Sequence, residues 1–149
     1  MLKSCLIGTL LITLTVLIQA IGTTLWLSSA KRRLAKNIEN KTDRYGFKLL
    51  IGTAVVLFVL HALQIVLWAW TYLLLIPRGE LQSLEQAVYF SFVTFTTLGY
   101  GDITLSEGWR LLSGIQALNG ILLVGWSTAL LFSVMQRLWQ SDAADTVAS

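Results

Sequence analysis

Three long runs without a charged residue restrict what this chain can fold into. They cover residues 4–30, 49–77 and 111–136, and each is longer than the roughly 20 apolar residues that a helix needs to cross a bilayer. Charged residues make up only 13% of the chain, against roughly 25% in soluble domains. Because so few charges cannot solvate a globular surface, the sequence predicts an all-α membrane protein with three transmembrane helices.

The first run competes with a secretory signal peptide, because Lys3 precedes it and small residues at 28–30 offer a cleavage site. Length separates the two interpretations. The apolar part of a signal peptide has about 7 to 15 residues, whereas this run is far longer and is followed at once by three cations at 31–33. We therefore expect residues 1–30 to form an additional, retained N-terminal transmembrane helix.

Positive charge is concentrated between the first two runs. Seven of the 11 Lys and Arg residues lie there, at positions 31, 32, 33, 36, 41, 44 and 48, against two anions, Glu39 and Asp43. The positive-inside rule assigns this loop, residues 31–48, to the cytoplasm. The expected location is the cell membrane, with the N-terminus outside, residues 78–110 on the outer side and the C-terminus cytoplasmic.

The clustering of cations also bears on partners. The formal charge of +3 could indicate nucleic acid, but its concentration in residues 31–48 is a topology signal, so no nucleic-acid partner is expected. Membrane lipids are the expected surroundings, and anionic headgroups could contact the loop at about 1 kcal/mol per cation. Topology alone already explains the charges. The short tail at residues 139–149 is small and polar and is expected to be frayed.

A fourth apolar stretch, residues 84–96, is too short to span a membrane and too apolar for an exposed loop. Ser83 and Gln86 have the spacing of a capping box, and about 13 helical residues cover about 20 Å, so this helix should enter the membrane and end inside it. Its carbonyl end would carry about half a negative charge, which favours a nearby cation. The expected order is an outer helix at 49–76, this re-entrant helix at 84–96, a loop at 97–101 and an inner helix at 109–138.

Residues 96–102 have the sequence Thr-Thr-Leu-Gly-Tyr-Gly-Asp and follow the re-entrant helix directly. Gly99 and Gly101 can adopt a positive φ, which lets successive carbonyls point to one side, whereas a residue with a Cβ pays about 1 to 2 kcal/mol there. Carbonyl oxygens can replace the hydration shell of a cation without fixed charge. Leu98 and Tyr100 are expected to point away from the carbonyls and pack behind the strand.

On this motif, residues 49–138 resemble the pore domain of potassium channels, in the bacterial ion-channel group related to two-transmembrane and two-pore channels. The resemblance implies a potassium-selective channel, not an enzyme, with K⁺ as the permeant ion and no cofactor. The implied selectivity filter binds K⁺ through its carbonyls and the Thr97 hydroxyl, and comprises Thr97, Leu98, Gly99, Tyr100 and Gly101. Because one chain cannot enclose such a pore, a homotetramer with fourfold symmetry is expected.

Five residues are expected to support the filter: Tyr89, Phe90, Val93, Thr96 and Asp102. The segment 89–92 resembles the aromatic cuff that precedes the filter in this family. Val93 stands where some relatives place a Glu that pairs with the Asp after the filter, so that carboxylate pair is absent; the side chain of Tyr89 could reach Asp102 instead. Leu98 replaces the Val of many members, a change also found in potassium-selective relatives.

In the last helix, Gly120 matches the hinge glycine of the family, although close helix packing explains it equally well. Four residues at helical spacing share one face and are expected to line the inner cavity together with Gly120: Ile121, Val124, Thr128 and Phe132. Four Phe132 rings are expected to form a hydrophobic gate that closes by dewetting.

Several other residues in the apolar runs have two interpretations. His61 could sense pH, but a neutral histidine bonded to a neighbouring helix is favoured, and Gln64 and Gln19 are expected to be interhelical hydrogen-bond partners. Asn119 could face the cavity or pack behind the filter. Cys5 is expected to be a buried, inert thiol.

Two other functions compete with a potassium channel. One is a weakly selective cation channel or a non-conducting subunit of a larger channel assembly. The other is a membrane enzyme or scaffold that binds phosphate through the Gly-rich loop, but no strand precedes the loop and no Lys-Ser/Thr pair follows it. The sequence contains no arginine-rich helix typical of a voltage sensor, so gating is expected to be intrinsic to the pore or to depend on a partner.

Overall fold

The regular structure is entirely helical in the residues that the structure, a computed structural model, describes: 1–36, 43–76 and 80–147. The four helices are α1 (Leu2–Lys36), α2 (Asp43–Leu75), α3 (Leu84–Phe95) and α4 (Arg110–Val147). Three of them, α1, α2 and α4, are long and apolar enough to cross a membrane. The predicted all-α membrane protein with three spanning helices is confirmed.

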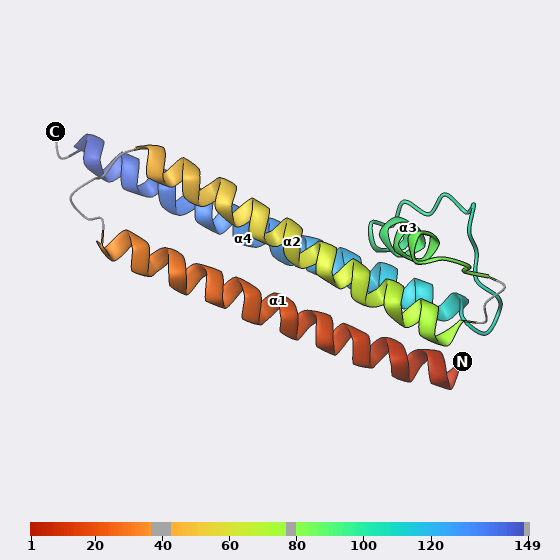
Figure 1. The fold of residues 1–149 in the computed structure, drawn as a ribbon. Coiled ribbons are helices and arrows are strands. Elements are labelled where there is room, and N and C mark those ends of the chain that lie inside the picture. The colour runs from red at the N-terminus through yellow and green to blue at the C-terminus, as the bar shows by residue number, and fades with distance from the viewer. Residues whose placement is uncertain (37–42, 77–79, 148–149) are drawn as a thin grey trace.

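The three long helices lie side by side, and α3 lies against one end of them (Figure 1). Helices α1 and α3 both contact α2 and α4. The N-terminus of α1 lies at the α3 end of the bundle, and the C-terminal end of α4 lies at the opposite end (Figure 1). A hydrogen bond of 2.8 Å from Ser4 Oγ to the Gly108 carbonyl ties the start of α1 to the loop before α4. The N-terminus and the α3 region therefore share one side of the bundle.

The largest apolar core lies near the α3 end, where all four helices meet. Each helix contributes at least one buried side chain to it, including Leu11 of α1, Trp68 and Tyr72 of α2, Phe90 of α3 and Leu112 of α4. The Tyr72 and Phe90 rings meet edge to face, with centroids 5.1 Å apart, a favoured aromatic geometry. This core holds α3 against the bundle.

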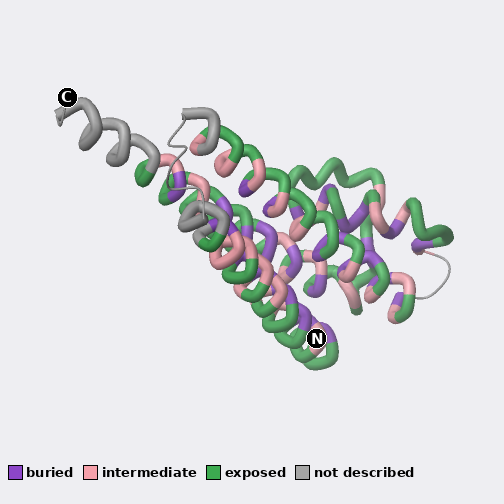
Figure 2. The backbone as a smooth tube through the Cα atoms, turned by 60° about the vertical axis from the view of Figure 1, so that its left-hand side comes forward, coloured by how far each residue is buried: buried purple, intermediate pink, exposed green. Residues whose placement is uncertain are grey.

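The buried face of α1 is unusually polar. Its members recur every three or four residues, as a helix requires: Ser4, Gly8, Leu11, Thr15, Gln19 and Thr23. The opposite face is apolar and exposed, for example at Leu10 and Leu25, which are 68% and 60% exposed. Figure 2 shows this alternation of buried and exposed positions along the tube. A helix with its polar residues inside and its apolar residues outside suits lipid and not water.

The helices are longer than the sequence predicts. Helix α1 continues beyond residue 30 to Lys36 and α2 begins at Asp43, so most of the expected loop 31–48 is helical, and residues 37–42 lie outside the described part. Helix α4 continues to Val147, where a frayed tail over residues 139–149 was expected. The start of α4 at Arg110 agrees within one residue with the expected 109.

Cys5 is exposed, so the expectation of a buried thiol is wrong. Most of the buried residues of α1 are small or polar, whereas Cys5 lies on the exposed face of the helix. A uniformly apolar run does not reveal which of its faces is packed, and the rule that places cysteine inside applies to packed faces only.

Candidate functional site

Helix α3 begins where the sequence predicts. Ser83 has an extended backbone and its side chain accepts a hydrogen bond of 3.2 Å from Gln86 N, so Ser83 is the N-cap. The reciprocal half of the capping box is shifted by one residue, because Gln86 Oε1 accepts from the backbone of Gln82 at 2.9 Å and not from that of Ser83. The helix ends at Phe95, and Thr96, the C-cap, donates its N–H to the Phe92 carbonyl at 3.0 Å.

In the 97–101 segment, every second residue has a positive φ angle. Positive φ angles occur at Thr97 (59°), Gly99 (55°) and Gly101 (77°). The expected positive φ of both glycines is confirmed, but that of Thr97 was not foreseen. A β-branched residue in this region is a genuine outlier and pays about 1 to 2 kcal/mol. Such strain persists only where surrounding contacts hold it, and it clusters at functional sites.

The contacts that hold this segment come from the last turn of α3. The Val93 carbonyl accepts from the N–H groups of Leu98 at 3.0 Å and Gly99 at 3.3 Å, and the Thr94 carbonyl accepts from Thr97 N at 3.0 Å. These bonds use carbonyls that a helix C-terminus otherwise leaves without a partner. The first half of the segment is therefore fixed to the end of α3 whose dipole favours a cation.

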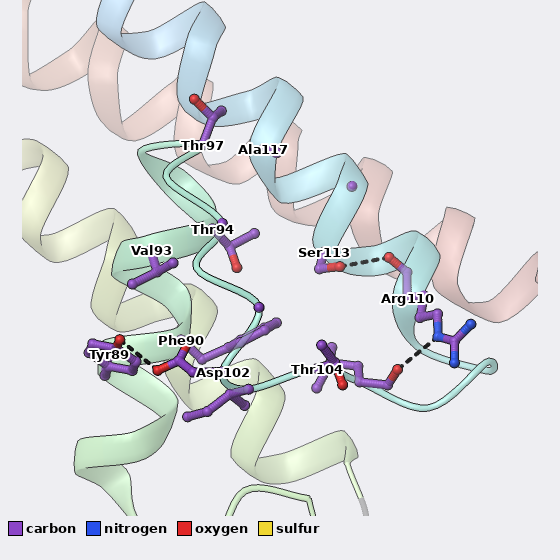
Figure 3. Close-up of a pocket in the computed structure, with 15 residues that line it drawn as sticks. Tyr89, Phe90, Val93, Thr94, Thr97, Asp102, Thr104, Arg110, Ser113 and Ala117 are labelled. Atoms are coloured by element: carbon purple, nitrogen blue, oxygen red, sulfur yellow. Dashed lines mark hydrogen bonds between the residues drawn. The ribbon is translucent and has the colours of Figure 1, made fainter.

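The other end of the segment is tied to the same helix. The Tyr89 hydroxyl donates a hydrogen bond of 2.7 Å to Asp102 Oδ2 (Figure 3), a length typical of bonds to a carboxylate. This bond lowers the pKa of the Asp102 carboxyl and raises the pKa of the Tyr89 hydroxyl. The contact with Asp102 that the sequence allows for the side chain of Tyr89 is thus formed.

Leu98 and Tyr100 do not pack behind the segment within one chain. Their side chains are 54% and 67% exposed. A cavity of about 490 Å³ lies beside the segment instead, lined by residues of α3, the 97–105 region and α4. Figure 3 shows Thr94 of α3 and Ser113 of α4 among its lining residues. The two exposed side chains and the open cavity leave this part of the chain without a full set of neighbours.

Phe90 lines the cavity beside the segment and is also part of the apolar core. It is 7% exposed and packs with Tyr72 in the core, so it anchors α3 to α2. Its neighbour Phe92 is 49% exposed. The expected aromatic cuff is therefore divided between the core and the surface of the chain.

Gly120 is buried and faces α3. A Cβ added there would overlap the carbonyl oxygen of Phe95. Of the two interpretations of this glycine, the structure therefore has close packing of α4 against the end of α3. Gly120 therefore does not belong to the expected cavity-lining face. The other four members of that face, Ile121, Val124, Thr128 and Phe132, are all exposed in the single chain.

A buried polar cluster that the sequence analysis missed joins α2, α3 and α4. Gln116 Nε2 donates to Ser91 Oγ at 2.7 Å, and Gln116 Oε1 accepts from the Tyr72 hydroxyl at 2.7 Å. Ser91 Oγ donates in turn to the Ile65 carbonyl at 2.8 Å. The signal that could have found it is Gln116 itself, an amide in the middle of a charge-free run.

The expected interhelical hydrogen bonds of His61, Gln64 and Gln19 are confirmed. His61 Nε2 lies 2.9 Å from Ser127 Oγ, and Gln64 Nε2 donates to Gln19 Oε1 at 2.9 Å. Asn119 fits neither of its two interpretations. Its Nδ2 donates to Thr15 Oγ1 at 2.9 Å, so it faces α1 and not the cavity or the 97–101 segment.

Comparison with known proteins gives one match. A family model described as "Ion channel" matches residues 53–137, which begin in α2, include α3 and the 97–101 segment, and end in α4. No curated protein matches the chain, and no solved structure matches it. Helix α1 lies outside the matched residues.

Proposed function

The chain belongs to the ion channel family, and on this premise we propose that it is a potassium-selective channel that conducts K⁺ passively. Its three membrane-length helices make it a multi-pass membrane protein. In the proposal, residues 97–101 are the filter strand. K⁺ binds to its backbone carbonyls and to the Thr97 hydroxyl, and no other cofactor is required.

The observation that carries the proposal is the alternation of positive φ at Thr97, Gly99 and Gly101 directly after the C-terminus of α3. Alternating hand lets carbonyls line one side of a strand, and rings of carbonyls replace the hydration shell of K⁺ in potassium channels. The partial negative charge at the end of α3 favours a cation at the same place. A tight turn of no function would not need a strained Thr97.

The proposed assembly is a homotetramer. Non-helical backbone at membrane depth must line water or be buried in protein, and one filter strand encloses nothing. A fourfold assembly would surround the pore with four strands, supply neighbours for Leu98 and Tyr100, and bring together the exposed face of α4 that carries Ile121, Val124, Thr128 and Phe132. Because Gly120 is buried against α3, the proposed inner cavity begins at Ile121.

The proposed setting is the cell membrane of a bacterium, with α1 as an additional transmembrane helix. The cations of residues 31–48 favour a cytoplasmic position for the end of the bundle remote from α3. The N-terminus and the filter strand would then face outward and the C-terminus inward. Contact of residues 31–48 with anionic lipid headgroups remains a prediction, since most of their side chains lie outside the described part of the chain.

The test is ion flux into liposomes that contain the purified full-length chain, with K⁺ compared against Na⁺. We expect rapid K⁺ uptake and little Na⁺ uptake. Gly99→Ala is the control, because a Cβ at a φ of 55° costs about 1 to 2 kcal/mol and should abolish selective flux. Equal uptake of the two ions would favour a weakly selective cation channel, and no uptake by an assembled tetramer would favour a non-conducting subunit.

A further inference from the structure

Four polar side chains from the three long helices close a ring of hydrogen bonds. His61 and Gln64 belong to α2, Gln19 to α1 and Ser127 to α4. The four bonds are His61 Nδ1 to Gln64 Oε1 at 3.2 Å, Gln64 Nε2 to Gln19 Oε1 at 2.9 Å, Gln19 Nε2 to Ser127 Oγ at 3.0 Å and Ser127 Oγ to His61 Nε2 at 2.9 Å. We call these residues the polar ring.

Three of the four bonds of the polar ring have a fixed direction. Each glutamine donates through Nε2 to the next member, so Gln64 Oε1 must accept from His61 Nδ1, and Nδ1 carries a proton. Ser127 Oγ accepts from Gln19 Nε2 and has both a hydroxyl proton and a second lone pair for its contact with His61 Nε2. Gln19 and Gln64 are fully buried and Ser127 is 7% exposed, so none of them exchanges its partner for water.

The polar ring touches the end of α3. The centroid of the His61 ring lies 5.6 Å from that of Phe95, the last residue of α3. Phe95 is only 2% exposed and packs with Ile65 of α2, Leu123 of α4 and Val16 of α1. All three long helices therefore meet around this one side chain.

The backbone of Phe95 is confined as well. Its carbonyl oxygen lies so close to Gly120 that a Cβ there would overlap it. Next to Gly120, Asn119 is bonded to Thr15 of α1 at 2.9 Å. Helix α1 is thus bonded to α4 at two positions along the helices. Thr15 bonds to Asn119, and one turn further along α1 Gln19 bonds to Ser127.

We propose that Gln19 and Ser127 are positioning residues for the filter strand, acting through His61 and Phe95. The first residues of the filter strand bond to the Val93 and Thr94 carbonyls. A shift of the last turn of α3 therefore moves the filter strand. The polar ring restrains that turn from the side of α1 and α4. Helix α1, which lies outside the family-matched residues, is thereby part of the permeation machinery. This inference rests on the proposed potassium channel.

The test compares variants of the full-length tetramer in planar bilayers, with the K⁺ to Na⁺ permeability ratio as the readout. Gln19→Met keeps the approximate size of the side chain but removes its hydrogen bonds, and Ser127→Ala removes one hydroxyl. Each variant removes two of the four bonds and should lower the ratio at least about fivefold. Ser127→Thr, which restores a hydroxyl, should return the ratio to near that of the wild type.

A closed ring also predicts non-additivity. Each of the two variants already removes the Gln19–Ser127 bond, so Gln19→Met combined with Ser127→Ala should cost less than the sum of the two single changes. Thr23→Val is the matched control on the same face of α1, because the Thr23 hydroxyl bonds only to carbonyls of its own helix, at 2.7 and 3.2 Å. It should leave the ratio unchanged.

Tetramer assembly and thermal unfolding are measured on every variant. If Gln19→Met does not assemble, Ser127→Ala decides alone. Assembled Ser127→Ala channels with the wild-type permeability ratio would overturn the positioning role, as would equal losses in Ser127→Ala and Ser127→Thr. A wild-type chain without K⁺ selectivity would instead overturn the proposed function before any variant is compared.

Discussion

The Tyr89 hydroxyl donates a hydrogen bond of 2.7 Å to Asp102 Oδ2, which joins the middle of α3 to the residue that follows the filter strand. The same helix holds the other end of the strand through the Val93 and Thr94 carbonyls. One short helix therefore supports both ends of the strand within a single chain. A rigid support of this kind favours a fixed geometry at a functional site.

Removing the Tyr89 hydroxyl should change how Asp102 titrates. The hydrogen bond lowers the pKa of the Asp102 carboxyl, so the contact is intact above the ordinary pKa of an aspartate and is lost as pH falls through the lowered value. In Tyr89→Phe the Asp102 pKa should rise toward its ordinary value. The measurement is the ¹³C chemical shift of the Asp102 carboxyl against pH. An unchanged midpoint in the variant would show that the bond does not form in the protein.

Gly120→Ala should destabilise the fold, because the new methyl group meets the backbone carbonyl of Phe95 and backbone cannot rotate away. Overpacking of this kind costs about 1 to 3 kcal/mol, measured as the loss of stability in chemical unfolding. Gly125→Ala is the control, since nothing lies within 4 Å of its added Cβ. Unchanged stability together with altered gating in Gly120→Ala would favour a hinge over close packing.

Gln116→Leu should break the cluster that joins α2, α3 and α4. It leaves the Tyr72 hydroxyl and the Ser91 hydroxyl without a partner at Gln116, and a buried group that loses its partner costs about 1 to 3 kcal/mol. Thermal unfolding of the wild type and of Gln116→Leu in detergent measures the difference in stability. Ser113→Ala serves for comparison, because that hydroxyl bonds only to the Arg110 carbonyl of its own helix. Equal stability of both variants would show that the cluster contributes nothing.

Phe132→Ala should increase leak through the closed channel. Phe132 is 55% exposed in the single chain, and four such rings around an axis would form an apolar constriction that closes by dewetting. Closed-state current in planar bilayers is the measurement. Phe58→Ala removes an exposed aromatic ring of α2, 70% exposed, and should leave this current unchanged. Equal leak in wild-type and Phe132→Ala channels would place the gate elsewhere.

The spanning helices and the start of α3 were predictable because local chemistry decides them. A charge-free run longer than a bilayer has no alternative to a helix in lipid, and Ser83 caps α3 through a bond to a residue three positions away. The positive φ of Gly99 and Gly101 was equally local, since glycine is the residue that tolerates it. These features need no knowledge of the rest of the fold.

What could not be predicted depends on tertiary contacts. Thr97 avoids a positive φ on its own and adopts it here with its N–H bonded to Thr94. The partner of Asn119 depends on which face of α4 turns toward α1, and a charge-free run does not specify this. The exposure of Cys5 has the same cause, since most of the buried residues of α1 are small or polar and many of its apolar ones lie on the outer face.

Potassium selectivity is tested most directly by the reversal potential of the wild-type channel in a planar bilayer, with equal concentrations of K⁺ on one side and Na⁺ on the other. If the filter strand replaces the hydration shell of K⁺, the reversal potential should be displaced strongly from zero, with the sign that a K⁺-selective pore requires. A reversal potential of zero in assembled, conducting channels would contradict potassium selectivity.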